Sequence, residues 1–311
     1  MTDFIDIVIE HGSTDISDKI LSYSRSVSIC EGIGTLELTL DDTGYSIDVW
    51  DTLTLTENGH QKGIFYVSGN ERNVKAGTRR ITAQDGSKLL ADYFISASYT
   101  IDYESYTGYW IDKFLTEAGV SHGAIGTGVA LSDNTQLGLS SAYDTIQTLL
   151  QYSGWYLYFD ENNVATIGSM TVHSGNPTKL TDSSILSVTT SKNDSMLRNR
   201  AVVWGNYDTV ASGYIFADNS VNTPWNYDSV DKRAVVVSNS AIYNQSDADE
   251  LSRKMLSEFA RINNEKTVEV AGEVNVTVGS FVNVKSKGWS GSGLITTIDV
   301  SFSSGGLITT L

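Results

Sequence analysis

The sequence has very few residues that could cross-link the chain or bind a metal: one cysteine, two prolines and four histidines among 311 residues. A disulfide framework needs paired cysteines, so that class of small secreted scaffold is excluded. Cys30 ends an alternating stretch, Val27-Ser28-Ile29-Cys30, and is interpreted as a small buried apolar residue. The histidines show no His-x-x-x-His or Cys-His spacing, so no metal ligand is predicted. They are His11, His60, His122 and His173.

Long apolar runs are also missing. No stretch approaches the roughly 20 apolar residues of a membrane span, and the N-terminus lacks the basic start and apolar run of a signal peptide. A soluble protein made in a cytoplasm is therefore expected. The formal net charge of −16, with scattered Lys and Arg, disfavours binding to nucleic acid. An acidic surface suits a passage through which DNA slides without sticking, although solubility is the simpler explanation.

The common catalytic motifs are absent as well. The sequence contains no Gly-x-Ser-x-Gly elbow, no phosphate-binding Gly-x-x-x-x-Gly-Lys-Ser/Thr loop and no dinucleotide fingerprint, so no catalytic residue and no cofactor are predicted. Carboxylate pairs of the kind used by glycosidases occur at Asp41-Asp42 and within Asp247 to Glu250. The first lies in a turn and the second at the start of a helix, so structural roles explain both.

Aromatic residues leave one alternative open. Sixteen tyrosines and six tryptophans are enough for a sugar-stacking platform. Three tryptophans fall on predicted apolar faces and three are expected to be exposed. The first three are Trp110, Trp155 and Trp204, and the others are Trp50, Trp225 and Trp289.

Abundant Thr, Ser, Val and Tyr favour strands over helix packing, so a mainly β fold with an α+β insertion is predicted. Residues 1–92 read as an N-terminal β-barrel domain of alternating strands. Among these strands are Thr35 to Leu40, Thr52 to Thr56 and Gly63 to Val67, and Asn58-Gly59 marks a tight hairpin between the last two.

Residues 93–184 change character and are predicted to form an α+β domain. A helix is expected from Tyr109 to Ala118, where Gly119 ends it. A second helix is expected over Ala142 to Ser153, with Ser141 and Asp144 at its start and Gly154 as a left-handed cap. A hairpin follows around Asp160 to Asn163, and helix and hairpin are expected to pack together.

Residues 185–311 are predicted to form a second β-barrel domain with an insertion loop at 206–240 and an amphipathic helix at 247–263. Ser246 and Asp249 form the expected capping signal of this helix. Gly272 and Gly279 mark turns around a strand predicted at Val274 to Val278, and glycines between the last two strands supply a hairpin. The apolar helix face comprises Ala248, Leu251, Met255, Phe259 and Ile262.

This order of elements resembles the hub proteins of phage baseplates and tail tips, related contractile injection systems and the core of type VI secretion spikes. Almost the whole chain takes part in the resemblance. Two departures are Gly279-Ser280, where family members often place an aspartate, and the loop from Tyr207 to Asp231, which has no assignable counterpart. The stretches that carry it are Gly63 to Val67 with Ile81 to Leu90, Asp144 to Gly168, Asn193 to Gly205, and Ala248 to Leu311.

The resemblance implies a structural virion protein rather than an enzyme. In such hubs two small barrels flank α+β parts, and three copies close into a ring with pseudo-sixfold symmetry. A homotrimer of this kind would adapt the sixfold tail tube to a threefold spike or central fibre. The implied partners are the tail tube protein, the spike or fibre protein, the tape measure protein and other baseplate proteins, with DNA passing through the ring. The alternative is a carbohydrate-binding or peptidoglycan-degrading tail component.

Overall fold

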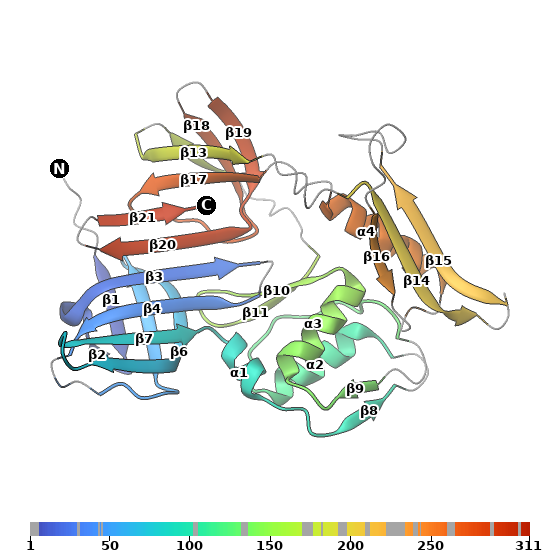
Figure 1. Cartoon of the computed structure of the whole chain (residues 1–311), viewed down its shortest axis with the longest axis horizontal. Coiled ribbons are helices and arrows are strands. Elements are labelled where there is room, and N and C mark those ends of the chain that lie inside the picture. Colours follow the sequence, from blue (N-terminus) through green and yellow to red (C-terminus); the bar gives the residue numbers. More distant parts are fainter. Residues whose placement is uncertain are drawn as a thin grey trace.

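A computed structural model describes most of the chain. The described residues are 6–29, 32–42, 44, 46–101, 105–131, 136–169, 177–181, 183–191, 198–208, 212–221, 234–238, 242, 244–259, 265–286, 289–303 and 306–311. Cys30, His173 and residues 193–197 lie outside them. About half of the loop predicted at 206–240 also lies outside them, and the prediction of a loop was wrong for the described part, which consists mostly of the strands Gly213–Ser220 and Ala234–Ser238. The fold is mainly β with a few short helices, as predicted (Figure 1). No helix among the described residues is long and apolar enough to cross a membrane.

The N-terminal part is built from strands that alternate buried and exposed residues. In β4, for example, Leu36, Leu38 and Leu40 are buried while Glu37 is exposed. The predicted hairpin at Asn58-Gly59 is confirmed, because both residues take positive φ, 48° and 78°, between β5 and β6. The elements are β1 (Ile7–His11), β2 (Thr14–Asp15), the 3-10 turn η1 (Ser17–Lys19), β3 (Ile20–Ser28), β4 (Gly34–Asp41), β5 (Thr52–Glu57), β6 (His60–Asn73) and β7 (Thr78–Gln84).

The middle part is a compact α+β unit with its own hydrophobic core. The second predicted helix is confirmed at both ends: the Asp144 amide donates to Ser141 Oγ at 3.0 Å, and Gly154 is left-handed with φ of 60°. The first predicted helix begins two residues earlier than expected, at Thr107. The elements are α1 (Ser87–Asp92), β8 (Ser98–Thr100), α2 (Thr107–Glu117), β9 (Gln136–Gly138), α3 (Ala142–Ser153), β10 (Tyr156–Phe159) and β11 (Ala165–Gly168).

Four of the C-terminal strands, β13, β17, β20 and β21, join the sheet of the N-terminal strands, whereas β12, β18 and β19 form a separate three-stranded sheet. β20 pairs antiparallel with β3, so strands from both ends of the chain join one sheet of eleven strands (Figure 1). Buried residues of the two ends likewise form one continuous core. The two predicted closed barrels are therefore not found, since the described strands form open sheets. The elements are β12 (Thr178–Thr181), β13 (Ile185–Ser191), β17 (Glu265–Ala271), β18 (Phe281–Ser286), β19 (Trp289–Leu294), β20 (Thr297–Ser303) and β21 (Gly306–Thr310).

A third, small unit lies between β13 and β17 in the sequence and stands apart at the right of Figure 1. Its sheet has the order β15-β14-β16, and α4 covers one face, burying Ala248 and Leu251 against Val203 and Ile215. The amphipathic helix therefore packs on this unit rather than on the closing strands that follow it. The elements are β14 (Arg200–Asp208), β15 (Gly213–Ser220), β16 (Ala234–Ser238) and α4 (Gln245–Phe259).

Two local predictions in this region were wrong. The cap of α4 is Asn244, whose Oδ1 accepts the Asp247 amide at 2.8 Å, so the helix starts before Ser246. Asn244 also donates to the Asp247 carboxylate at 2.7 Å, which completes a reciprocal cap. Residues 274–278 form no strand, because Gly272 and Gly279 turn the chain at both ends with φ of 85° and 81°. The domain boundaries at 92 and 184 stay predictions.

Candidate functional site

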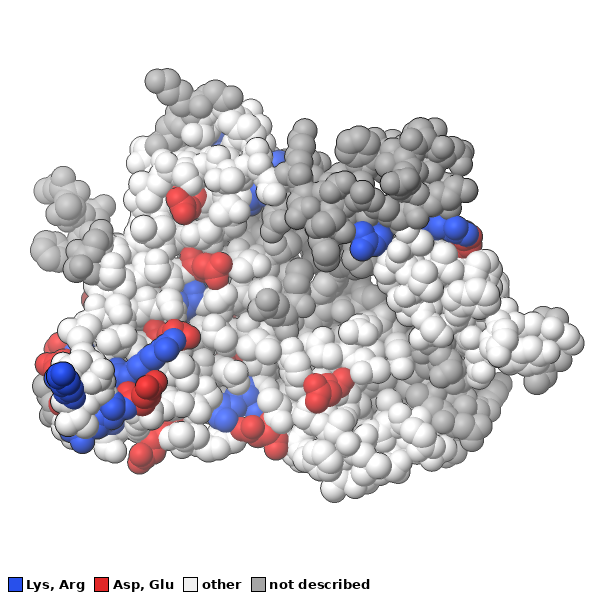
Figure 2. Space-filling model, viewed as in Figure 1, with Lys and Arg blue, Asp and Glu red and all other residues white. Residues whose placement is uncertain are grey.

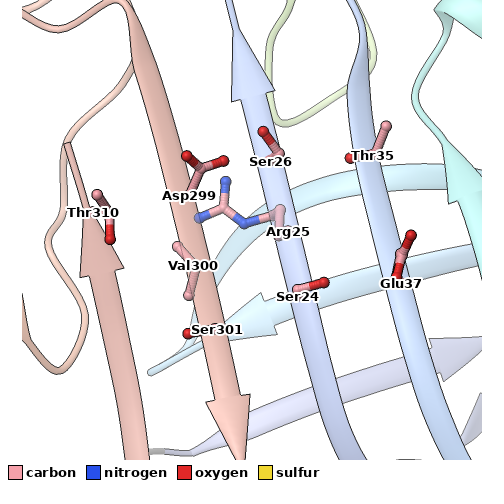
Figure 3. A pocket seen from close by; sticks show the side chains of 9 residues that line it. All are labelled: Ser24, Arg25, Ser26, Thr35, Glu37, Asp299, Val300, Ser301 and Thr310. Carbon is pink, nitrogen blue, oxygen red and sulfur yellow. The ribbon is translucent and has the colours of Figure 1, made fainter.

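A depression lies where the two ends of the chain join, on the outer face of β4, β3, β20 and β21 (Figure 3). It is a depression of about 310 Å³ that opens to solvent. Serine and threonine hydroxyls dominate its walls, with the carboxylates of Glu37 and Asp299. The lining residues are Ser24, Arg25, Ser26, Thr35, Glu37, Asp299, Val300, Ser301 and Thr310.

Strand alternation explains this polar surface. Ser24 and Ser26 of β3 are on the outer face, while the alternate residues Tyr23 and Arg25 are buried. The lining includes two carboxylates, Arg25 and several hydroxyls, but neither histidine, lysine nor cysteine. The depression offers hydrogen-bond donors and acceptors along its walls.

Directly beneath it lies a buried charged cluster. Glu57, at the end of β5, is fully buried, and its Oε1 accepts a hydrogen bond from the Tyr23 hydroxyl at 2.8 Å. Arg25 is 8% exposed, and its Nε lies 3.6 Å from the same oxygen, which makes an ion pair rather than a hydrogen bond. Burial and the Glu57 carboxylate together raise the pKa of Tyr23 far above its usual range. The tyrosine therefore stays neutral and donates.

A second charged group, unlike the first, connects the N-terminal and C-terminal parts of the chain. Lys62 of β6 forms an ion pair with Glu273, which follows β17, and both side chains are about nine-tenths buried. Asn58, in the β5–β6 turn, donates to the other Glu273 oxygen at 2.6 Å. These contacts fasten the N-terminal hairpin to the C-terminal strands. The sequence signal that would have revealed the clusters is a charged residue at an inward strand position, as at Arg25.

The histidines occupy separate places. His11 Nε2 lies 2.9 Å from the Asp51 carboxylate, His60 is exposed at a hairpin, and His122 contacts the Gly123 carbonyl at 2.9 Å. Within the described ranges no three His, Cys, Asp or Glu side chains gather in a way that could hold a metal ion.

The acidic pairs named from the sequence take part in structural contacts. The hydrogen bond from Arg72 holds the pKa of Asp42 below its usual range, and Arg79 binds the other oxygen at 3.1 Å. At the start of α4, Asp247 belongs to the helix cap and Glu250 pairs with Lys254 at 2.7 Å.

Two of the tryptophan predictions are confirmed and one is wrong. Trp110 is 8% exposed among Tyr99 and Phe114, and Trp50 is 47% exposed. Trp204, expected on a buried face, is 43% exposed. The run Ala201-Val202-Val203-Trp204 is apolar at every position, so alternation could not tell which residues face α4.

The remaining tryptophans are less informative. Trp155 and Trp289 are both half-buried, although Trp289 was expected to be exposed. Trp225 lies outside the described residues.

No protein-family model matches the sequence, and no curated protein matches it. Solved structures do. The 43 kDa tail protein of prophage MuSo2 from Shewanella oneidensis is similar over 98% of this chain and 96% of its own, with a TM-score of 0.73 and 14% identity. The tail protein from Neisseria meningitidis MC58 is similar over 99% and 95%, with a TM-score of 0.74 and 11% identity.

A chain of the Francisella PdpA–VgrG complex is similar over 99% of this chain and 57% of its own, with a TM-score of 0.56 and 13% identity. At such identities the likeness concerns the fold, and it spans all three units described above. The resemblance inferred from the sequence is confirmed at that level: this chain has the fold of these bacterial and prophage tail proteins.

Proposed function

We propose that this chain is a structural hub protein of a phage tail baseplate or tail tip, placed in the virion and without enzymatic activity of its own. The observation that carries the proposal is the agreement in fold with prophage tail proteins along nearly the full length of both chains. Matching whole chains rather than one module favours a shared architectural role over a shared local site.

In this proposal three copies form a ring that adapts the tail tube to a threefold spike or central fibre, next to the tape measure protein and other baseplate proteins. The junction of the two chain ends supports it. The pairing of β20 with β3 makes one continuous sheet, and the buried Lys62–Glu273 pair connects the two ends as well, so each copy would present both β parts as one rigid piece. A ring that connects two other assemblies needs subunits that do not flex between their contact surfaces.

The open sheets support an assembly as well. β13 lies at one edge of the large sheet, and β15 and β16 are edges of the small one. Free edges invite pairing with other chains unless they are covered, and neighbours in a ring would cover them. The viewed face of the N-terminal strands carries acidic and basic side chains side by side (Figure 2). Passage of DNA through the ring without binding remains part of this proposal.

The test is the mass and shape of the purified full chain. Sedimentation analysis is expected to give three times the 33.8 kDa of one copy, and electron microscopy to give rings with threefold symmetry and a central opening. A species of one copy at every concentration would contradict the proposal.

The second candidate, a carbohydrate-binding or peptidoglycan-degrading tail component, draws on the polar depression with its two carboxylates. It predicts peptidoglycan turnover that falls at least a hundredfold in Glu37→Gln or Asp299→Asn. No turnover by the wild-type chain, together with no retention on glycan arrays, would remove it.

A further inference from the structure

The small unit formed by β14–β16 and α4 has one covered and one bare face. α4 covers the face that carries Val203, Ile215 and Ala217. The opposite face carries a row of exposed aromatic residues, which we call the aromatic face: Trp204, Tyr207, Tyr214 and Phe216. Their exposed fractions are 43%, 48%, 64% and 38%.

These four rings form one connected group. The centroid distances are 4.7 Å from Trp204 to Phe216, 6.5 Å from Trp204 to Tyr214 and 5.3 Å from Tyr207 to Tyr214. A fully buried aromatic side chain of this kind removes about 150–250 Å² from water. With roughly half of each of the four side chains exposed, the aromatic face presents roughly 400 Å² of apolar surface. Exposed apolar patches of this size on a monomer are often interaction sites.

An irregularity in the pairing of β14 with β15 brings the four rings to the same face of the sheet. Trp204 and Tyr207 are three residues apart, so regular alternation would put them on opposite faces of the sheet. The pairing register of β14 with β15 shifts between Trp204 and Tyr207, and this irregularity returns Tyr207 to the face that carries Trp204. Gly205 lies within the shift, where a side-chain Cβ would come 2.5 Å from the Ile242 carbonyl oxygen.

Charge on this face identifies the kind of partner. Among the described strand residues, the charged side chains here are Arg200 and Asp218, and they bind each other, with Arg200 Nε donating to Asp218 Oδ1 at 2.7 Å. Few Lys, Arg, Asp or Glu are visible on the viewed side of this unit in Figure 2. Aromatic enrichment with depletion of charge is the composition of the core of a protein–protein interface.

A sugar is a poorer fit. Sugar rings stack on flat aromatic faces and need free hydrogen-bonding groups around them. Here the interacting rings are inclined at 56°, 75° and 84° to one another, and the charged polar groups are engaged with each other. The geometry favours a protein surface that interdigitates with tilted rings.

We infer that the aromatic face docks against a second copy of this chain. Each copy carries a formal net charge of −16, so two copies repel one another except where their surfaces are neutral. A basic partner would instead be drawn to unpaired acidic groups. The patch is about half of the roughly 800 Å² that each partner contributes to a standard interface, and surrounding residues would form the rim. As a contact within the ring, this inference rests on the proposed function.

The test compares the full chain with two glutamate variants by sedimentation velocity over a range of concentrations. Tyr214→Glu places a charge in the middle of the aromatic face, and Val74→Glu places one at the distant β6–β7 turn, where Val74 is 76% exposed. Tyr214→Glu is expected to weaken self-association at least tenfold, and Val74→Glu to leave it unchanged. Circular dichroism melting checks that both variants fold. A photo-cross-linking benzoylphenylalanine at position 214 is expected to join two copies.

The outcomes separate this inference from the ring. If the wild-type chain forms a three-copy species that Tyr214→Glu loses, the docking face and the ring are both supported. If the wild-type chain forms a two-copy species that Tyr214→Glu loses, the docking face is supported and the ring is contradicted. A three-copy species that survives Tyr214→Glu, with no cross-link from position 214, overturns the docking face and leaves the ring standing. A wild-type chain that stays monomeric overturns both. Glycan retention that depends on Tyr214 overturns the inference in favour of a sugar site.

Discussion

Replacing the buried Glu57 by glutamine tests the charged cluster that connects β3 to β5 inside the shared core. The amide keeps the shape of the side chain and can still accept the hydrogen bond of the Tyr23 hydroxyl, but it removes the charge that faces Arg25 at 3.6 Å. Arg25 is only 8% exposed, so its guanidinium would lose its counter-ion without gaining water. Breaking such a pair from one side costs about 3–5 kcal/mol of unfolding free energy.

A double-mutant cycle separates the interaction free energy of the Arg25–Glu57 pair from the cost of burying each charge. Arg25→Met should cost a similar amount, because it leaves the fully buried Glu57 carboxylate without its counter-ion. Glu57→Gln with Arg25→Met leaves no unpaired charge, so the double variant should be clearly more stable than the sum of the single effects, with a coupling of about 2 kcal/mol or more. Chemical denaturation followed by circular dichroism measures all four proteins.

The matched control is Glu37→Gln, on the neighbouring strand β4. Glu37 is exposed and pairs with Arg80 at the surface, so its replacement should leave the denaturation midpoint unchanged. If Glu57→Gln were as harmless as Glu37→Gln, or if the two buried substitutions were simply additive, the Arg25–Glu57 pair would not stabilise the core in the way argued above.

Three further predictions concern single sites. Asn244→Ala should destabilise the chain by about 1 kcal/mol while Ser246→Ala does not, and equal effects in denaturant would contradict the assigned cap of α4. Burial raises the pKa of Asp85 to about 6. The folded state therefore binds this proton more tightly than the unfolded one, so the group adds on the order of 2–3 kcal/mol of stability as pH falls from 7 to 4. Asp85→Asn should remove that part of the pH dependence, and an unchanged profile would refute it. Met255→Asp should unfold the unit around α4, because Met255 packs on its core; protection of α4 amides from hydrogen exchange as in the wild type would argue against that packing.

Elements that depend on neighbouring residues were predictable from the sequence. The α3 helix carries its own stop and start signals in Ser141, Asp144 and Gly154, and all three act as expected. The Asn58-Gly59 turn and the β10–β11 hairpin follow in the same way. Each is decided by backbone preferences and hydrogen bonds within a few residues, which the sequence states directly.

Elements that depend on distant partners were not predictable in this way. The face of α4 is apolar in the sequence, but which sheet it covers depends on β14 and β15, far earlier in the chain. Trp204 lies in a run that is apolar on both faces, and only the position of α4 decides that it is exposed. The closing strands join β3 rather than closing on themselves, because an edge strand pairs with whichever edge the rest of the fold brings beside it.

The sequence by itself therefore determined the mainly β class and the individual helices and hairpins, since these follow from periodicity and caps, and the order of elements already pointed to the fold of tail proteins. Only the tertiary structure decided that the two ends share one core, that Arg25 and Glu57 meet inside it, and that four aromatic rings gather on a bare sheet face. Contacts between residues distant in the chain are set by packing and strand register, which no local pattern specifies.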